Sequence, residues 1–241
     1  KEMYLLVTGF YAFLSHLDYL YAAVAAYFCG CFNGALLTSR LFFHDDIRTH
    51  GSGNAGLTNF YRTYGAKYAA LVVVCDMLKA VAAVGFAAWL GARFDPRILP
   101  DLPLTAAERA EYVLHFKYWA GLFCVLGHMF PCTAKFKGGK GILCSATLTL
   151  LLDWRIALVC WTLFALLWLT TRYVSLGSVS AAAAFPVLTW LVFGDALAAA
   201  LSVCIAALVV WAHRGNIRRL RNGTENKFHF HVNAPKTEEE E

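Results

Sequence analysis

Seven apolar segments joined by short polar connections are the feature that most constrains the fold of this chain. They cover residues 18–39, 65–91, 112–131, 141–153, 155–171, 178–193 and 195–213. A helix needs about 20 predominantly apolar residues to cross a bilayer. Unpaired backbone groups are costly in lipid, so such segments are expected to be helical. We therefore predict an all-α integral membrane protein with about seven transmembrane helices. The fourth and sixth segments are short, and one of them could be a re-entrant or interfacial piece.

The composition agrees with a membrane protein. Hydrophobic residues make up 59% of the chain and charged residues 15%, with a mean hydropathy of +0.53, whereas an average soluble domain has about a quarter charged residues. We predict one membrane domain over 18–228, after an amphipathic or interfacial extension (1–17) and before an exposed tail (229–241). The sequence has no basic run with interleaved aromatic residues, so nucleic acid is not an expected partner. It predicts no metal, no cofactor and no obligate protein partner.

The distribution of charge predicts an orientation. In a seven-span chain the connections after the first, third, fifth and seventh spans lie on one face. Those connections and the tail carry 14 of the 21 Lys and Arg residues, against six on the other face. Because positively charged loops stay in the cytoplasm, we predict a cytoplasmic C-terminus and an N-terminus outside.

A polar, glycine-rich segment, Ser39–Asn59, follows the first span and is expected to be a loop. Its glycines allow close approach of a ligand, and free N–H groups in such turns bind anions. Arginine adds a planar fork that matches phosphate oxygens. We predict phosphate binding by Ser39, Arg40, Arg48, Gly51, Ser52, Gly53 and Asn54, supported by Thr58 and Asn59. The alternative is a loop whose arginines lie among lipid head groups.

A second glycine cluster, Lys137–Gly141, comes directly before the fourth span. A helix N-terminus offers unpaired N–H groups to an anion, so Gly138, Gly139 and Lys140 form a second phosphate-binding candidate. The cluster is not a Walker A loop, because Lys140 is followed by glycine and not by Ser or Thr. The alternative is that the lysines extend to the membrane surface.

Other polar residues are expected at the same face. They are His128, Arg172, Ser175, Ser178, His213, Asn216, Arg219 and Glu225. Of these, Ser178 is predicted to bind substrate phosphate. His213 and Asn216 are three residues apart, so they share a helix face; the alternative for this segment is a basic, lipid-facing amphipathic helix. A lone histidine at a helix end, such as His128, is more often structural than catalytic. Glu225 is expected to pair with local arginines. Within the second span, Asp76 and Lys79 are expected to form a structural ion pair.

Several of these motifs occur in a characteristic order. They are Ser39-Arg40, Asp46-Ile47-Arg48, Gly51-Ser52-Gly53-Asn54 and Thr58-Asn59; Gly127-His128, Phe130-Pro131 and Phe136-Lys137-Gly138-Gly139-Lys140-Gly141; Arg172-Tyr173, Ser175 and Ser178; and His213, Asn216-Ile217, Arg219-Leu220, Gly223, Glu225 and Lys227. In them the chain resembles the PlsY family of bacterial acyl-phosphate:glycerol-3-phosphate acyltransferases. Residues 142–145 depart from the family pattern, which more often has small residues and threonine there.

The resemblance implies a seven-helix enzyme of the bacterial inner membrane with its active site on the cytoplasmic face. It implies transfer of a fatty acyl group from acyl phosphate to the 1-hydroxyl of glycerol 3-phosphate, giving lysophosphatidic acid and phosphate in the first step of phospholipid synthesis. Substrates and membrane lipid are then the only expected partners.

Roles follow as hypotheses from this resemblance. Arg48, Ser39 and the main chain of Ser52-Gly53 are expected to hold glycerol 3-phosphate, and Lys140 with Gly138-Gly139 to neutralise acyl phosphate. His213, Asn216 or a substrate phosphate oxygen receives the proton. Lys140, His213 and Asn216 are thus the catalytic candidates. Two alternatives from other classes are a transporter of a phosphorylated solute, which predicts paired repeats and broken helices at the bilayer midplane, and a lipid-binding scaffold.

Overall fold

The chain is described by a computed structural model over residues 2–94 and 104–229, with side chains from Leu17 onward. Within these ranges every regular element is helical. The elements are α1 (Glu2–Cys31), α2 (Gly34–Phe43), η1 (Ile47–Thr49), α3 (Leu57–Tyr64), α4 (Ala66–Arg93), α5 (Ala106–Met129), η2 (Cys132–Ala134), α6 (Ile142–Leu152), α7 (Trp154–Thr171), α8 (Val174–Phe193), α9 (Ala196–Ala212) and α10 (Arg214–Arg221). The predicted all-α class is confirmed. The backbone of α1 is helical from Glu2, through the segment predicted as an interfacial extension, and residues 230–241 of the predicted tail lie outside the described residues.

A helix occupies each of the seven predicted spans. Four stretches in the described ranges are long and apolar enough to cross a bilayer, namely 17–43, α4, α7 and α8, and the bent pair of α9 and α10 gives a fifth. The sixth predicted span is therefore a full-length helix. By contrast, α6 has only 11 residues, about 16 Å of rise against a hydrocarbon core of about 30 Å. It reaches about halfway across.

The first predicted span is two helices, which corrects the expectation of one. The break follows from Asn33, whose side-chain oxygen accepts a hydrogen bond from the N–H of Leu36 at 3.0 Å and so caps the start of α2. Because α2 continues to Phe43, Ser39 and Arg40 lie in a helix and not in the predicted loop.

A buried charge stabilises this break. The carbonyl oxygens of Gly30 and Phe32, at the end of α1, accept hydrogen bonds from the ammonium group of Lys79 at 3.2 and 2.7 Å. The same ammonium lies 2.7 Å from Oδ1 of Asp76, so the predicted intramembrane ion pair is confirmed. The Asp76 oxygen also accepts a hydrogen bond from the N–H of Gly34, the first residue of α2.

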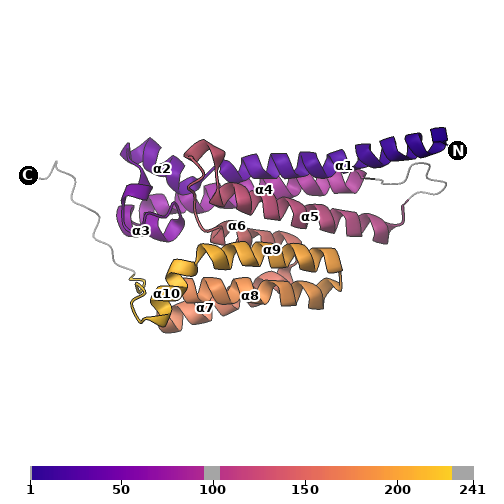
Figure 1. Ribbon diagram of the computed structural model, residues 1–241. Coiled ribbons are helices and arrows are strands. Elements are labelled where there is room, and N and C mark those ends of the chain that lie inside the picture. The colour runs from indigo at the N-terminus through magenta and orange to yellow at the C-terminus, as the bar shows by residue number, and fades with distance from the viewer. Residues whose placement is uncertain (1, 95–103, 230–241) are drawn as a thin grey trace, which may run out of the picture.

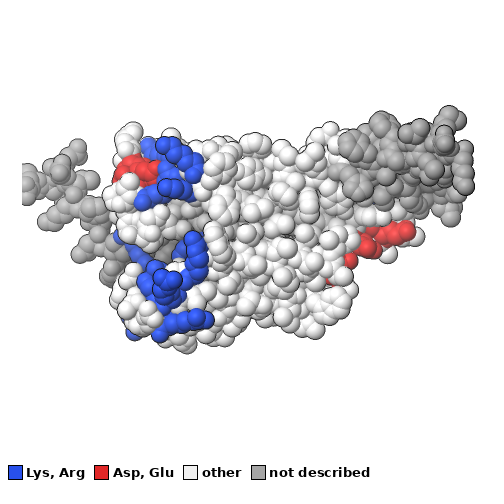
Figure 2. Space-filling model, in the orientation of Figure 1, with Lys and Arg blue, Asp and Glu red and all other residues white. Residues whose placement is uncertain are grey.

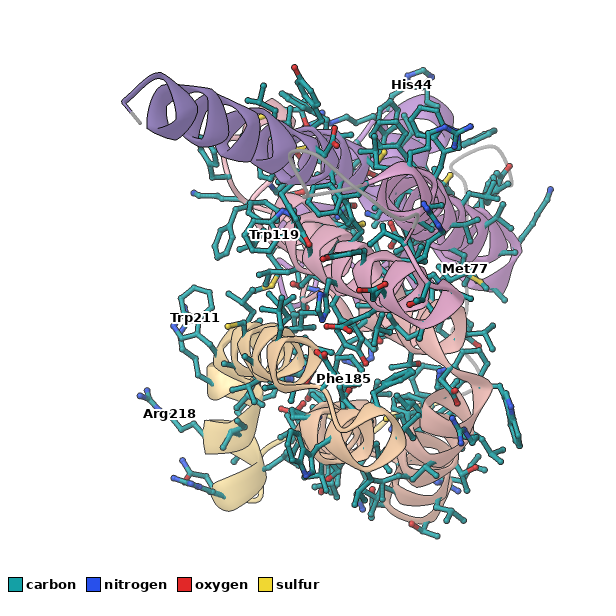
Figure 3. The ribbon with its side chains drawn as sticks, turned by 90° about the vertical axis from the view of Figure 1, so that its right-hand side faces the viewer. His44, Met77, Trp119, Phe185, Trp211 and Arg218 are labelled. Atoms are coloured by element: carbon teal, nitrogen blue, oxygen red, sulfur yellow. The ribbon has the colours of Figure 1, made fainter. Side chains whose placement is uncertain are left out.

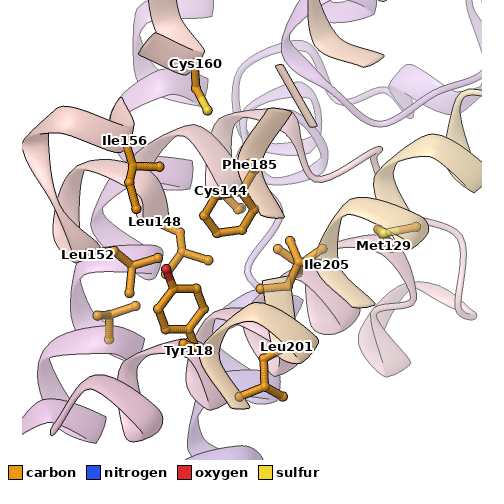
Figure 4. Packing of buried hydrophobic residues seen from close by; sticks show 13 residues of the cluster. Tyr118, Met129, Cys144, Leu148, Leu152, Ile156, Cys160, Phe185, Leu201 and Ile205 are labelled. Carbon is orange, nitrogen blue, oxygen red and sulfur yellow. The ribbon is translucent and has the colours of Figure 1, made fainter. Parts of the chain in front are cut away.

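The helices form two layers (Figure 1). One contains α1, α4 and α5, and the other α7, α8 and α9, while α6 lies between them and contacts α4, α5 and α7. The inner side chains of both layers meet in one core, where Tyr118, Leu148, Ile156, Phe185 and Ile205 are each at most 3% exposed (Figure 4). At one end of the bundle lie α2, α3 and α10, and the polar motifs gather there.

Two glycines bring α1 and α5 unusually close near that end. A Cβ atom on Gly127 would lie 2.1 Å from the carbonyl oxygen of Tyr27, and one on Gly30 would lie 2.2 Å from that of Cys124. Only glycine fits such a crossing. The contact fixes the end of α5, and with it the loop that begins after Met129.

Candidate active site

Glu225 is the centre of a polar cluster at the α10 end of the bundle. Its carboxylate accepts hydrogen bonds from Ser175 Oγ at 2.7 Å, Asn216 Nδ2 at 2.6 Å and Arg219 Nε at 2.7 Å. The Glu225 side chain is only 6% exposed. Burial raises the pKa of Glu225, but these three hydrogen bonds and the charge of Arg219 together bring it below its ordinary value. The carboxylate is therefore ionised at neutral pH, and the expected pairing of Glu225 with a local arginine is confirmed.

Lys140 enters the same cluster from the loop before α6. Its ammonium group donates a hydrogen bond to Oδ1 of Asn216. Burial, together with the positive charges of Arg219 and Arg62, lowers the pKa of Lys140 to about 8, against the opposing attraction of Glu225. An ammonium with so few partners is suited to bind an added anion.

Arg62 is a site residue that the sequence reasoning did not identify. It lies on α3, where one guanidinium nitrogen donates to the carbonyl oxygens of Asn226 and Lys227 at 3.3 and 3.4 Å. Burial lowers its pKa, against the attraction of Glu225. A signal was present, because Leu57–Tyr64 is strongly amphipathic and carries Arg62 as its only charge.

His213 lies at the junction of α9 and α10 and is 3% exposed. Its Nδ1 atom is 2.8 Å from the carbonyl oxygen of Val209. A carbonyl only accepts, so Nδ1 carries a proton and, in the neutral ring, Nε2 has a free lone pair. His213 is close enough to Lys140 and Glu225 to interact electrostatically with both.

We call these seven residues the Glu225 cluster: Arg62, Lys140, Ser175, His213, Asn216, Arg219 and Glu225. They come from all four connections that the sequence placed on one face, although the first contributes Arg62 and none of the residues predicted there. At neutral pH three cations surround one carboxylate, which leaves the cluster positively charged. Figure 2 shows Lys and Arg gathered at this end of the molecule, beside a wide uncharged surface.

The chain after α10 returns across the cluster. The N–H of Phe228 donates to the carbonyl oxygen of Arg172 at 2.8 Å. The Phe228 ring packs against Tyr61 and Trp168, with centroids 5.2 and 5.5 Å away. These contacts hold the returning segment, which includes Glu225, against α3 and α7. Arg172 itself is exposed at the end of α7, and the Ser178 hydroxyl donates to the carbonyl of Val174 at 2.9 Å, so neither side chain joins the cluster.

In the first motif segment, Ser39 and Asn59 hold the chain in place. Ser39 is fully buried, and its Oγ donates to the carbonyl of Leu36 at 3.2 Å. The Asn59 side chain accepts from the N–H of Ser52 at 2.9 Å and donates to the carbonyl of His50 at 3.0 Å. The remaining predicted residues there, Gly51, Ser52 and Gly53, are exposed, and Asn54 and Thr58 are partly exposed.

Arg48 connects the two glycine-rich segments. Its Nε and Nη2 atoms contact the two carboxylate oxygens of Asp46 at 2.9 and 2.6 Å, while Nη1 donates to the carbonyl of Ala134 at 2.8 Å. This guanidinium therefore contacts protein groups in the described structure, and its contact with substrate phosphate stays a prediction. Arg40 lies 3.4 Å from the same aspartate and is half exposed.

The N–H groups of Gly138 and Gly139 are also occupied, which corrects the expectation that they are free for an anion. They donate to the carbonyls of Met129 and His128 at 3.0 and 3.1 Å. The loop is tight, because a Cβ atom on Gly139 would lie 2.2 Å from Nε2 of His128 and 2.7 Å from the carbonyl oxygen of Ala55. Glycine at these positions therefore places Lys140.

His128 links the buried ion pair to the glycine loop. Its Nδ1 atom is 2.7 Å from the ammonium group of Lys79. The ligand atoms of Asp76, His128 and Cys144 are close enough to hold a metal ion together. However, the Lys79 ammonium lies 2.7 Å from both Asp76 and His128 and would repel a metal cation.

Comparison with known proteins shows which family the chain belongs to. Residues 20–223 match the sequence profile described as glycerol-3-phosphate acyltransferase. The chain belongs to this family. A glycerol-3-phosphate acyltransferase of Fusobacterium nucleatum is 37% identical over 86% of this chain and 96% of its own. One of Salinibacter ruber is 39% identical over 84% of this chain and 89% of its own.

Solved structures from the glycerol-3-phosphate acyltransferase family share the fold. The crystal structure of the integral membrane enzyme PlsY in its glycerol 3-phosphate form has a TM-score of 0.74 and 28% identity, covering 88% of this chain and 96% of that one. The lysophosphatidic acid form has a TM-score of 0.71 and 27% identity over the same shares. The chain is accordingly a multi-pass membrane protein of an acyltransferase family.

Proposed function

We propose that this chain transfers a fatty acyl group from acyl phosphate to the 1-hydroxyl of glycerol 3-phosphate, giving lysophosphatidic acid and phosphate. The observation that carries the proposal is the Glu225 cluster, in which three cations gather around one carboxylate. The glycerol 3-phosphate and lysophosphatidic acid forms of PlsY support this substrate and this product.

The positive cluster suits a reaction that involves phosphate groups. Lys140 and Arg62 are partly buried, so they interact more strongly than exposed cations do with an anion that displaces water. In the proposed site they neutralise substrate phosphate and the negative charge that develops on the carbonyl oxygen and the departing phosphate. Arg219 pairs with Glu225, which holds α10 and the returning segment together.

The proposed chemical step needs alignment more than activation. The 1-hydroxyl oxygen forms a bond to the acyl carbonyl carbon, the carbonyl–phosphate C–O bond breaks, and phosphate leaves with the bonding electrons. His213 is the proposed acceptor of the hydroxyl proton, through Nε2. Asn216 is an amide with no useful basicity, so we assign it to positioning Lys140 and Glu225. The activated donor lets proximity supply much of the rate enhancement.

We propose that the Glu225 cluster lies at the cytoplasmic face of the bacterial inner membrane. The excess of Lys and Arg in the connections at this end supports that orientation. The N-terminus of the chain is then outside the cytoplasm and the C-terminus is cytoplasmic. No protein partner or cofactor is part of the proposal, and the residues of the first motif segment support the site by holding the glycine loop.

An assay with purified, lipid-reconstituted protein tests which acyl donor is used. The protein is incubated with glycerol 3-phosphate and either palmitoyl phosphate or palmitoyl-CoA, and lysophosphatidic acid and free phosphate are measured. We expect equal amounts of both products from palmitoyl phosphate and none from palmitoyl-CoA. Product from palmitoyl-CoA would overturn the proposed donor, and product from neither would overturn the acyltransfer itself.

A further inference from the structure

Helix α10 has two faces with different surroundings. Asn216 and Arg219 contact Glu225, whereas Arg214, Arg218 and Arg221 are exposed. These three arginines are spaced i, i+4 and i+7, so they lie along one side of the helix. The outer face is therefore free of the contacts that build the Glu225 cluster.

A hollow of about 530 Å³ lies along this outer face. We call it the arginine groove; its lining residues are Arg214, Arg218, Arg221, Asn222, Val210, Trp211 and Ile217. Trp211 is 50% exposed, and the Arg214 guanidinium lies 4.0 Å from the centre of its ring. Figure 3 shows Trp211 and Arg218 projecting away from the helices on the same side.

Within residues 2–94 and 104–229, no carboxylate neutralises the charges of the groove. Among the described residues, Arg214, Arg218 and Arg221 form no ion pair with a carboxylate, whereas Arg48, Arg155 and Arg219 each have an acidic partner. Three guanidinium groups without an acidic partner among the described residues are complementary to phosphate oxygens.

The apolar residues of the groove identify the kind of anion. A soluble phosphate needs only the cations, but Val210, Trp211 and Ile217 add an apolar surface that such an ion would not cover. Tryptophan and arginine side by side are typical of a bilayer interface. The bend of 59° between α9 and α10 places the groove where an apolar helix ends and a basic one begins.

We propose that the arginine groove binds the head group of an anionic phospholipid from the surrounding bilayer. Its phosphate is held by Arg214, Arg218 and Arg221, and its glycerol and upper acyl chain pack against Trp211 and Val210. This site is separate from the Glu225 cluster and does not depend on the proposed acyl donor.

The test measures retained lipid by native mass spectrometry of the full chain. The protein is equilibrated with equal amounts of phosphatidylglycerol and phosphatidylcholine. The variant R214Q/R218Q/R221Q is compared with R93Q/R109Q/R155Q, which removes the last residue of α4 and one arginine from the first turn of each of α5 and α7. Arg93 is a matched control, because it also stacks on a tryptophan, with its guanidinium 4.2 Å from the ring of Trp89. Thermal unfolding checks that each variant is folded, and the single variant Arg218→Gln replaces the triple variant if that does not fold.

We expect the wild type and the control variant to retain phosphatidylglycerol in preference to phosphatidylcholine. Each arginine near an anionic lipid surface contributes roughly fivefold to binding, so the groove variant should lose at least about tenfold of its phosphatidylglycerol. Unchanged retention in the groove variant would overturn the proposal. Displacement of the lipid by excess inorganic phosphate would also overturn it, in favour of a site for soluble anions.

Discussion

The side-chain nitrogen of Asn216 donates a hydrogen bond of 2.6 Å to Oε1 of Glu225. Its oxygen faces the opposite way and accepts a hydrogen bond from Lys140. A neutral amide thus links the carboxylate and the ammonium group and fixes their separation. The two charges stay close, but Lys140 is not bound directly to Glu225.

Replacement of Asn216 by Asp should therefore reduce activity. The variant loses the donor to Glu225 and places a second carboxylate against the first. A hydrogen bond to a charged group is worth about 1.5–3 kcal/mol, so we expect kcat/KM for lysophosphatidic acid formation to fall about tenfold to a hundredfold. Asn222→Asp, at the exposed end of α10, is the matched control and should be nearly neutral. Wild-type activity in Asn216→Asp would exclude a positioning role for this amide.

The pH dependence of KM for glycerol 3-phosphate should follow the protonation of Lys140. Its pKa is about 8, chiefly because the ammonium is buried. Below that pH Lys140 is protonated and attracts phosphate; as the pH rises through about 8 the cation is lost. We expect KM for glycerol 3-phosphate to rise over this range. In Glu225→Gln the carboxylate that raises the Lys140 pKa is removed, so the rise in KM should move to lower pH. A KM that does not change around pH 8 would contradict this role.

Replacement of Arg48 and of Arg40 by alanine should have different effects on activity, although both arginines contact Asp46. Arg48 makes a bidentate ion pair and also bonds to the carbonyl of Ala134, whereas Arg40 is half exposed and makes one contact of 3.4 Å. We expect Arg48→Ala to cost about 1.5–3 kcal/mol in activity and to lower the Tm. Arg40→Ala should cost about 0–1 kcal/mol, as for exposed ion pairs. A large loss of activity in Arg40→Ala with an unchanged Tm would instead indicate that Arg40 contacts substrate.

Much of the fold follows from the sequence, because long apolar segments in a bilayer have few alternatives to helices. The break before α2 does not follow, since it depends on the Asn33 cap and on Lys79, which is 49 residues from Gly30. Such a long-range hydrogen bond has no local signal in the sequence.

The residues of the Glu225 cluster were also predicted in part. Lys140, His213, Asn216 and Glu225 were identified through their motifs, and the structure brings them together. Whether a polar group faces a substrate or another part of the protein depends on distant partners. For this reason the occupied N–H groups of Gly138 and Gly139 and the burial of Ser39 could not be read from the sequence alone, whereas the amphipathic segment around Arg62 was a signal that could have been used.

Substitution of Gly139 tests the tightness of the loop that places Lys140. A Cβ atom there would overlap His128 and Ala55, and overpacking of this kind typically costs about 1–3 kcal/mol. We expect Gly139→Ala to lower both the Tm and the activity. Gly85→Ala is the control, because a Cβ atom there meets nothing within 4 Å and a helical alanine should stabilise by about 0.5–1 kcal/mol. A Tm for Gly139→Ala as high as that of the wild type would show that the loop adapts.

The most direct test of the account is a single-turnover reaction of reconstituted protein with glycerol 3-phosphate and palmitoyl phosphate, with the wild type and Lys140→Met measured side by side. Lysophosphatidic acid and free phosphate are followed over time, and thermal unfolding confirms that both proteins are folded. The account predicts equal formation of the two products by the wild type and a loss of at least about tenfold in Lys140→Met, in line with the loss of a charged hydrogen-bond donor. Equal rates in the two proteins, or no lysophosphatidic acid from the folded wild type, would contradict it.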